Sequence, residues 1–490
     1  MFASVTSVAL VGVEPQPVRV EAHVGGGEKL RFHLVGLPDT AIREAKERVQ
    51  AAVVSSGYRF PNCTVVVNLS PADLPKGGTA YDLPIALAVL SAAGIEKLGA
   101  SPMVALGELA LDGEVRSVRG GLGAALVARR QGGRCLLPTD AAGEAVVAGA
   151  DGIHAVRYLA EAVAVAKGEL AGGPIAEPVS SPEPVLDLAD VRGQLMARRA
   201  MEVAAAGGHH LLMVGPPGAG KTMLARAMPG ILPPLTDEER FEVALAWAAA
   251  GRARAGGDAP PFRAPHHSAT MAAIVGGGSG SPVPGEVTLA HRGVLFLDEL
   301  GEFPGHLLDA LRQPLEEGSL VVARKGVSVE FPAAFQVVAA TNPCPCGFAG
   351  DRVVSCRCGR AAVDKYRRRL SGPLLDRFDL RVRVARLEAS ELSGAAGESS
   401  AVVRARVVAA RRRQWERGRL NRLLSRKELD ALEWATEASA LLERSVDALA
   451  LTGRGWDRVR KVAVTIADLA AGDRVEEHHV AEALAYRGAE

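Results

Sequence analysis

One glycine-rich stretch in the middle of the chain constrains the fold more than any other feature. Residues 215–222 read GPPGAGKT, which fits the phosphate-binding pattern G-x-x-x-x-G-K-[ST] without a mismatch. An apolar run at 211–214 leads into it as a buried strand would, and residues 223–228 leave it at helical spacing. The sequence therefore predicts a strand, a phosphate loop and a helix, the centre of an α/β nucleotide-binding domain.

The residue types of this stretch suit a bound triphosphate. Glycines let backbone N–H groups close around phosphate oxygens, and the following helix presents the positive end of its dipole. We expect Lys221 to reach the β- and γ-phosphates of ATP and the Thr222 hydroxyl to hold Mg²⁺. An ordinary glycine-rich turn is the competing interpretation, which the flanking pattern disfavours. The predicted nucleotide-binding residues are Gly215, Pro216, Pro217, Gly218, Ala219, Gly220, Lys221 and Thr222.

Polar residues directly follow two further apolar runs. Residues 294–297 are followed by Asp298 and Glu299, and residues 335–341 are followed by Asn342. A central parallel strand delivers such groups to the phosphate edge of its sheet. We expect Asp298 to complete the Mg²⁺ shell, Glu299 to polarise the attacking water, and Asn342 to hold that water from the side.

Length and charge limit the possible functions. With 490 residues the chain has room for about two to four domains. Its net charge of +1 excludes a polycation, so nucleic-acid binding would depend on local patches. The first residues lack a basic region followed by an apolar core, and no apolar run is long enough to span a bilayer. We therefore expect a cytoplasmic protein without membrane contact.

The pattern divides the chain into four regions. Residues 1–167 mix alternating and helical segments, as an α+β domain does, and 168–186 form a linker rich in Pro, Gly and Ser. Residues 187–386 hold the phosphate loop, and 387–490 have the helical periodicity of an all-α lid. Between Arg404 and Lys427 lie ten Lys or Arg and one acid, Glu416. This basic stretch could meet nucleic acid, an acidic neighbouring subunit or only solvent.

These motifs carry a resemblance to a known family. Together with segments 207–218, 262–267, 284–291 and 342–347, they resemble the AAA+ ATPases of the magnesium-chelatase-like YifB/ComM family over essentially the whole chain. The resemblance implies a P-loop AAA+ core with a parallel sheet, a magnesium-chelatase-type lid and a hexameric ring. It also implies ATP sites between subunits, each completed by an arginine of the neighbour.

The resemblance points to two arginines in particular. Arg377, in the segment GPLLDRFD, best matches the finger that stabilises charge on the γ-phosphate. A structural ion pair with a neighbouring aspartate is the alternative, and residues 367–369 supply rival fingers. Arg454 matches a second sensor arginine at the start of a lid helix, with Arg458 as the second choice. Arg454 could also be a solvated cap residue.

The N-terminal region resembles a protease domain that has lost its chemistry. Segments 37–39, 67–78 and 107–113 resemble the domain in front of magnesium-chelatase-like ATPases. That domain in turn resembles the Lon proteolytic domain, with its ribosomal S5 domain 2-like fold. Such proteolysis needs a serine nucleophile and a lysine base. The matching positions hold Ala80 and Gly123, so we expect a scaffold without the catalytic dyad.

Two insertions interrupt the predicted core. Residues 319–323 and 327–331 read as strands of a β-hairpin with Arg324 and Lys325 at its tip. Such hairpins line the pore of related ring ATPases, which makes these two residues candidates for sequence-independent contacts with DNA phosphates. A solvated turn is the alternative. Residues 274–285 read as an exposed loop.

Cysteines gather in one short segment. Four thiolates could bind a structural Zn²⁺ tetrahedrally and hold together a loop of Gly, Pro and Arg. The spacing departs from the common C-x-x-C pairs, and reduced thiols or an oxidisable pair are the alternatives. His266 and His267 are interpreted as structural hydrogen-bonding residues. The four candidate zinc ligands, which lie within 15 residues, are Cys344, Cys346, Cys356 and Cys358.

The resemblance implies a DNA motor. ATP hydrolysis at Lys221, Asp298 and Glu299, completed by Arg377 of the next subunit, would pull DNA through the ring. The activity implied is branch migration by a helicase in natural transformation. One alternative is a motor that drives Mg²⁺ insertion into a tetrapyrrole. Another is a protein-remodelling ring or switch without a DNA role.

Overall fold

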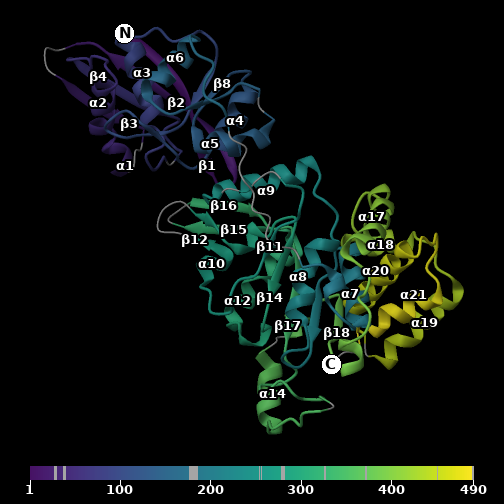
Figure 1. Ribbon diagram of the computed structural model, residues 1–490. Coiled ribbons are helices and arrows are strands. Elements are labelled where there is room, and N and C mark those ends of the chain that lie inside the picture. The colour runs from purple at the N-terminus through teal and green to yellow at the C-terminus, as the bar shows by residue number, and fades with distance from the viewer. Residues whose placement is uncertain are drawn as a thin grey trace.

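The chain folds into three lobes (Figure 1). An N-terminal lobe is built on one sheet, a central lobe on a second sheet, and a helical lobe follows at the C-terminal end. This arrangement confirms the expected α/β class with an all-α C-terminal region. The computed structural model describes residues 1–26, 30–36, 40–74, 76–149, 151–175, 186–252, 254, 257–277, 282–324, 327–351, 353–369, 372–449 and 451–487.

The N-terminal lobe contains a seven-stranded sheet in the order β3-β4-β2-β1-β5-β8-β9. Strands β1 and β4 pair antiparallel with β2, and the other neighbours run parallel. Helices α2, α3 and α6 bury apolar side chains on one face, and α4 and α5 do so on the other. The elements are β1 Phe2–Val11, β2 Glu14–Val24, β3 Arg31–Val35, α1 Thr40–Arg43, α2 Ala45–Ser55, β4 Thr64–Ser70, α3 Asp82–Ala92, β5 Met103–Ala105, β6 Glu108–Leu109, β7 Val115–Arg116, α4 Gly121–Arg130, β8 Arg134–Pro138, α5 Thr139–Ala145, β9 Ile153–Val156 and α6 Leu159–Lys167.

The two positions that match the protease dyad are packed. Ala80 contacts the apolar cluster of α4 and α5. Gly123 is buried in α4, where a Cβ atom would lie 3.0 Å from Pro15 and 3.1 Å from Leu10. The side chains of Pro15 and Leu10 would have to shift to admit a side chain at position 123, and the scaffold role of this lobe stays a prediction.

The central lobe contains a five-stranded parallel sheet in the order β11-β14-β17-β10-β18. Strands β14 and β17 are buried along their whole length, as central strands of a parallel sheet must be. The carboxyl ends of β10, β14 and β17 therefore meet at one edge. The elements are α7 Leu195–Gly207, β10 Leu211–Val214, α8 Lys221–Ile231, α9 Asp237–Ala249, β11 Phe262–Arg263, α10 Met271–Val275, β12 Gly276–Gly277, β13 Val283–Pro284, α11 Glu286–Leu289, β14 Val294–Leu297, α12 Gly305–Ala310, α13 Arg312–Glu317, β15 Ser319–Arg324, β16 Val327–Pro332, β17 Gln336–Thr341, α14 Arg360–Arg369, α15 Gly372–Leu375, β18 Leu380–Arg383 and α16 Ala389–Leu392.

One of the two insertions matches its prediction and the other does not. Strands β15 and β16 pair antiparallel as the expected hairpin. Lys325 at its tip, like the side chain of Arg324, lies outside the described residues. The prediction of an exposed loop at 274–285 is wrong for residues 274–277 and 282–285, because β12 pairs with β13 and Ile274 is fully buried, whereas residues 278–281 lie outside the described residues. A Cβ atom on Gly285 would lie 2.4 Å from the Ile274 carbonyl oxygen, so glycine here serves a close backbone approach.

The helical lobe shares a core with the central lobe. One buried cluster joins α17, α19, α20 and α21 to α7, α8 and one face of the five-stranded sheet. Figure 1 shows these helices beside α7 and β18. Among the described residues, no helix combines the length and the apolar composition needed to cross a bilayer. The elements are α17 Ser400–Glu416, α18 Arg426–Asp430, α19 Thr436–Ala448, α20 Gly453–Leu469 and α21 Glu477–Ala485.

The N-terminal lobe packs directly on α9 and on the β15–β16 hairpin of the central lobe. Ala244 and Ala248 of α9 belong to the same buried cluster as α4 and α5. The β1–β2 turn inserts Val11 and Val13 against the core that contains the β15–β16 hairpin. A Cβ atom on Gly12 in that turn would lie 2.4 Å from Val329 of β16. Residues 176–185 of the predicted linker lie outside the described residues.

Candidate nucleotide-binding site

The phosphate loop connects β10 to α8 and depends on its glycines. Gly218 and Gly220 have φ angles of 75° and 90°, which side-chain-bearing residues rarely adopt. Gly215 lies against β18, where a Cβ atom would come within 2.1 Å of the Val384 carbonyl oxygen. The loop can leave the sheet at this point because residue 215 has no side chain.

Lys221, the first residue of α8, points back into the loop. Its ammonium donates to the carbonyl oxygens of Gly215 and Pro216 at 2.6 and 2.9 Å, and to Oδ1 of Asn342 at 3.2 Å. Burial lowers the pKa of Lys221, and the negative charges of Asp298 and Glu299 act in the opposite direction. The structure therefore brings the predicted phosphate-binding lysine and the predicted water-holding amide into direct contact.

Thr222 and Asp298 meet across the same edge of the sheet. The Thr222 hydroxyl donates to Oδ2 of Asp298 at 2.8 Å, and Oδ1 of Asp298 accepts the backbone N–H of Glu299 at 3.0 Å. A hydroxyl and a carboxylate are hard oxygen ligands of the kind that Mg²⁺ prefers. The donor set therefore fits the metal that the sequence predicts.

Glu299 lies just beyond the buried end of β14 and contacts a histidine. Its φ angle of 51° lies in the left-handed region, which is uncommon for a residue with a long side chain. Nδ1 of His267 is 3.4 Å from a carboxylate oxygen of Glu299. The His267 ring also stacks on His266 at 4.1 Å and meets the edge of Phe303 at 6.4 Å. The sequence interpretation of His267 as only structural missed this contact.

Gln194 is a further residue of the site that no sequence motif indicated. It precedes α7 with a φ angle of 52°, and its amide nitrogen donates to the carbonyl oxygens of Ala219 at 3.0 Å and Ala385 at 2.6 Å. The side chain thus ties the phosphate loop to the segment that follows β18. Gln194 acts on the loop through tertiary hydrogen bonds, and a single glutamine in a sequence does not indicate such bonds.

Of the two arginines implied by the resemblance, one is ion-paired and the other is exposed. The Arg377 guanidinium pairs with Glu316 of α13. Arg454 is exposed in the first turn of α20, a helix capped by the Thr452 hydroxyl. Arg458, the second choice, lies one turn further on with its Nε 3.5 Å from a carboxylate oxygen of Asp379.

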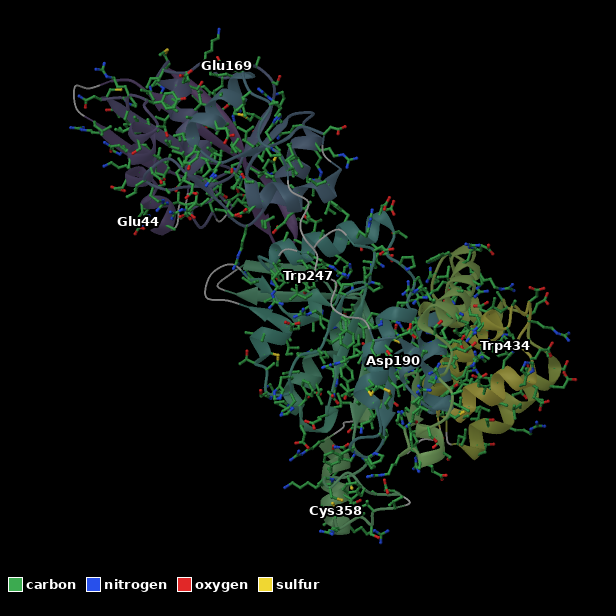
Figure 2. The ribbon with its side chains drawn as sticks, in the orientation of Figure 1. Glu44, Glu169, Asp190, Trp247, Cys358 and Trp434 are labelled. Carbon is green, nitrogen blue, oxygen red and sulfur yellow. The ribbon has the colours of Figure 1, made fainter. Side chains whose placement is uncertain are left out.

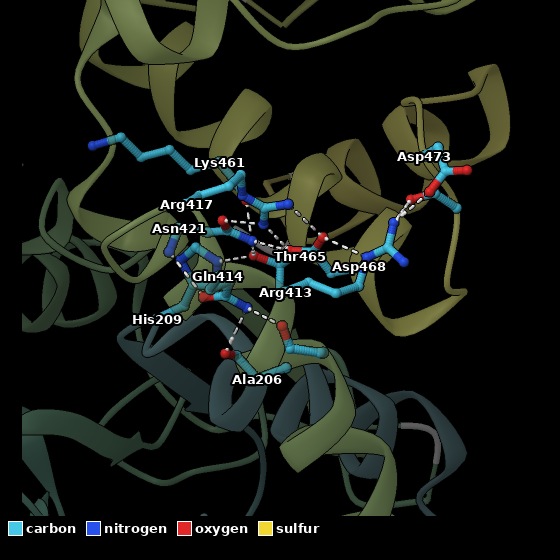
Figure 3. A network of polar contacts seen from close by, with 12 residues as sticks. Ala206, His209, Arg413, Gln414, Arg417, Asn421, Lys461, Thr465, Asp468 and Asp473 are labelled. Atoms are coloured by element: carbon cyan, nitrogen blue, oxygen red, sulfur yellow. Dashed lines mark hydrogen bonds and ion pairs between the residues drawn. The ribbon is translucent and has the colours of Figure 1, made fainter.

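A buried polar network joins the central sheet to the helical lobe (Figure 3). His209 contacts Oδ2 of Asp379 at 3.3 Å through Nδ1 and the Thr465 hydroxyl of α20 at 2.8 Å through Nε2. Asn421 donates to both Thr465 and Asp468. Burial raises the pKa of Asp379, but the hydrogen bond to His209 and nearby positive charges outweigh it, so the pKa lies below the usual range. The position of α20 is thus fixed relative to β10 and β18.

Many basic side chains of the stretch from Arg404 to Lys427 contact other residues of the same chain. Most of its arginines bind acids or carbonyl oxygens of α7 and of the helical lobe, so they hold the lid in place. These contacts within the chain do not test whether the stretch also meets nucleic acid, a neighbouring subunit or solvent, so that stays a prediction. The contacts are Arg406 with Glu202 and Glu398, Arg411 with the carbonyl of Ala205, Arg413 with Asp473, and Arg417 with Asp468.

Comparison with known proteins matches most of the chain to one family. The family model described as magnesium chelatase, subunit ChlI, covers residues 187–392. A second model, described as subunit ChlI of Mg-chelatase, covers residues 20–141. The model of the ChlI C-terminal region covers residues 397–487.

Several relatives match the chain from end to end. YifB of Salmonella typhimurium is 42% identical over 99% of this chain and 97% of its own length. A protein of Mycobacterium tuberculosis is 44% identical over 98% and 97%. The competence protein ComM of Haemophilus influenzae is 41% identical over 99% and 97%. A 38 kDa magnesium-chelatase subunit of Acidiphilium rubrum is 40% identical over 12% of this chain.

Proposed function

The chain belongs to the magnesium-chelatase ChlI family, with YifB and ComM as full-length relatives, and is an AAA+-type ATPase; on that premise we propose that it forms a ring that couples ATP hydrolysis to the movement of DNA. The observation that carries the ATPase part is the hydrogen bond from Thr222 to Asp298 beside the loop-directed Lys221. These groups support the proposal because a magnesium-bound triphosphate needs a lysine beside its phosphates and hard oxygen ligands for its metal.

Each residue of the site has a defined task in hydrolysis. The glycines of the loop present backbone N–H groups to the phosphates, and Lys221 exchanges its carbonyl partners for phosphate oxygens. Thr222 and Asp298 would hold Mg²⁺, which would supply charge neutralisation when bound. Glu299 accepts a proton from the attacking water, and Asn342 orients that water from the neighbouring strand.

The ring is the part of the proposal that rests on the family resemblance. We assign Arg377 to the site of the adjacent subunit as the finger that stabilises γ-phosphate charge, because its segment matches the family's finger. Its pairing with Glu316 holds the guanidinium at the surface of α13. Arg454 or Arg458 at the start of α20 would report nucleotide state to the lid. We propose six subunits in the cytoplasm, as the family resemblance implies.

The DNA role rests on the hairpin and on one relative. The β15–β16 hairpin carries Arg324 and Lys325 at its tip, and a ring would place its tips around the pore. A full-length relative is named competence protein ComM. We therefore propose sequence-independent contacts with the DNA backbone and branch migration as the reaction.

Filter binding tests the DNA role directly. Single-stranded and branched DNA should be retained at low salt with a non-hydrolysable ATP analogue, and retention should fall as salt rises. The double variant Arg324→Ala/Lys325→Ala should lose retention, whereas Arg412→Ala in α17 should keep it. Absence of retention at low salt, or retention equal in both variants, would contradict DNA threading and favour a chelatase-type motor or a protein-remodelling ring.

A further inference from the structure

Four thiol groups meet in the loop between β17 and α14. The sulfur atoms of Cys344, Cys346, Cys356 and Cys358 all lie within 4.8 Å of one another. The separations are 3.4 Å from Cys344 to Cys346 and 3.6 Å from each of these to Cys356. A disulfide needs about 2.0 Å, whereas sulfurs around a tetrahedral Zn²⁺ with Zn–S bonds of about 2.3 Å are about 3.8 Å apart. We propose that these four thiolates bind one structural Zn²⁺.

Apolar packing contributes little to the shape of this loop, in which Asp351 accepts the N–H groups of Val353 and Val354. Strand β17 ends at Thr341 and α14 begins at Arg360, which leaves the described residues between them, 342–351 and 353–359, without helix or strand. Loops of this length in compact domains are uncommon. In the described part of this loop, Cys344 is the one buried side chain of the apolar class. A metal supplies the cross-link that an apolar core does not.

The backbone around the sulfurs is arranged for negative charge. The N–H groups of Cys346 and Cys358 donate to Cys358 and Cys356 at 3.4 Å, and that of Ala349 donates to Cys344 at 3.2 Å. Hydrogen bonds of this kind stabilise a thiolate and orient it as a ligand. Several thiolates at these separations repel one another unless a cation lies between them. Divalent zinc suits a set of four sulfurs.

The cysteine loop also touches the phosphate loop. The Gly347 N–H donates to the Cys344 carbonyl at 2.9 Å and closes a tight turn with a φ angle of 85°. A Cβ atom on Gly347 would lie 2.4 Å from Pro217 and 3.8 Å from the amide carbon of Asn342. Figures 1 and 2 show Cys358 and α14 on a projection at the end of the central lobe. The zinc therefore fixes the turn that frames Pro217 and Asn342, an inference that rests on the proposed ATPase function.

Metal analysis of the purified full-length chain tests the site without reference to activity. We expect about one zinc per chain, and thiolate-to-cobalt charge-transfer absorption after replacement of zinc by Co²⁺. Cys356→Ser, at an exposed ligand, should lose the metal, whereas Cys63→Ser in the N-terminal lobe should keep it. A folded wild-type chain that binds nucleotide but no metal would overturn the proposal. The cobalt spectrum of the wild type decides the matter if the variant does not fold.

Two glycine variants test the link to the phosphate loop. Gly347→Ala should retain its zinc but lower kcat about tenfold through displacement of Pro217 and Asn342. Gly359→Ala, where a Cβ atom meets open space, should change neither zinc content nor kcat. Equal kcat in both variants would overturn the link. A zinc-loaded wild type without ATPase activity would instead contradict the proposed function and leave the metal site standing.

Discussion

Nδ1 of His267 lies 3.4 Å from the carboxylate of Glu299, which gives the predicted water-activating residue a partner on another element. Glu299 follows β14, whereas His267 follows β11, the strand beside β14 in the sheet. The Glu299 carboxylate is 55% exposed, and this contact joins it to the His267 ring. We expect His267→Ala to lower kcat about tenfold with little change in KM for ATP. His267→Gln, which keeps a donor, should recover part of the loss. A change in KM alone would contradict a positioning role.

Removal of the Glu299 charge separates binding from hydrolysis. Glu299→Gln should bind ATP as the wild type does, because Lys221, Thr222 and Asp298 are intact, but should turn it over at least about a hundredfold more slowly. Fluorescent-nucleotide binding and phosphate release measure the two effects. The matched control is Glu302→Gln, one turn away and paired with Arg369, which should keep turnover within about twofold. Normal turnover in Glu299→Gln would remove this residue from its assigned task.

Mixed rings test whether Arg377 acts on the next subunit. Arg377→Ala and Lys221→Ala chains should each be inactive alone, and their mixture should regain activity at interfaces that combine an intact lysine with an intact arginine. Glu316→Gln breaks the Arg377 pair but keeps the arginine, so it should retain turnover. Glu316 is 56% exposed, and the pair should contribute about 1 kcal/mol or less to stability. Assembled mixtures without recovered turnover would contradict the finger assignment.

Acid should destabilise the protein partly through His210. Nδ1 of His210 accepts the Val337 N–H at 3.0 Å, and burial together with the positive charge of Arg422 lowers its pKa to about 3, against a weaker opposing effect of Asp379. An unfolded histidine has a pKa of about 6.5, so below that pH the unfolded state takes up a proton that native His210 does not. The part of the folding stability that depends on neutral His210 is therefore complete above pH 6.5 and is lost as the pH falls toward 3.

At pH 4.5, His210 should lower the free energy of unfolding by about 2–3 kcal/mol relative to pH 7. His210→Gln keeps an acceptor for Val337 but does not titrate, so its unfolding midpoint should change less between pH 7 and pH 4.5 than that of the wild type. Urea unfolding at both pH values measures the difference. Parallel pH profiles for the two proteins would contradict a neutral, buried His210.

The nucleotide site was largely predictable because its residues follow apolar strands that end at one sheet edge. Lys221, Asp298 and Asn342 come together for that reason. The His267 contact was not predictable, because it depends on β11 lying next to β14 rather than on sequence distance. The arginines of α17 have the composition of a binding surface, and only the fold shows that Arg406 pairs with Glu202 and Arg413 with Asp468. Gly285 falls in a segment predicted as an exposed loop, although it serves a close backbone approach.

The central claim is that hydrolysis at this site moves DNA, and ATP turnover measured across a titration of single-stranded DNA tests it most directly. The account predicts that turnover rises with DNA and saturates, that the rise weakens with added salt, and that Arg324→Ala/Lys325→Ala keeps basal turnover but loses the rise. Turnover that is identical with and without DNA at every salt concentration would contradict the claim.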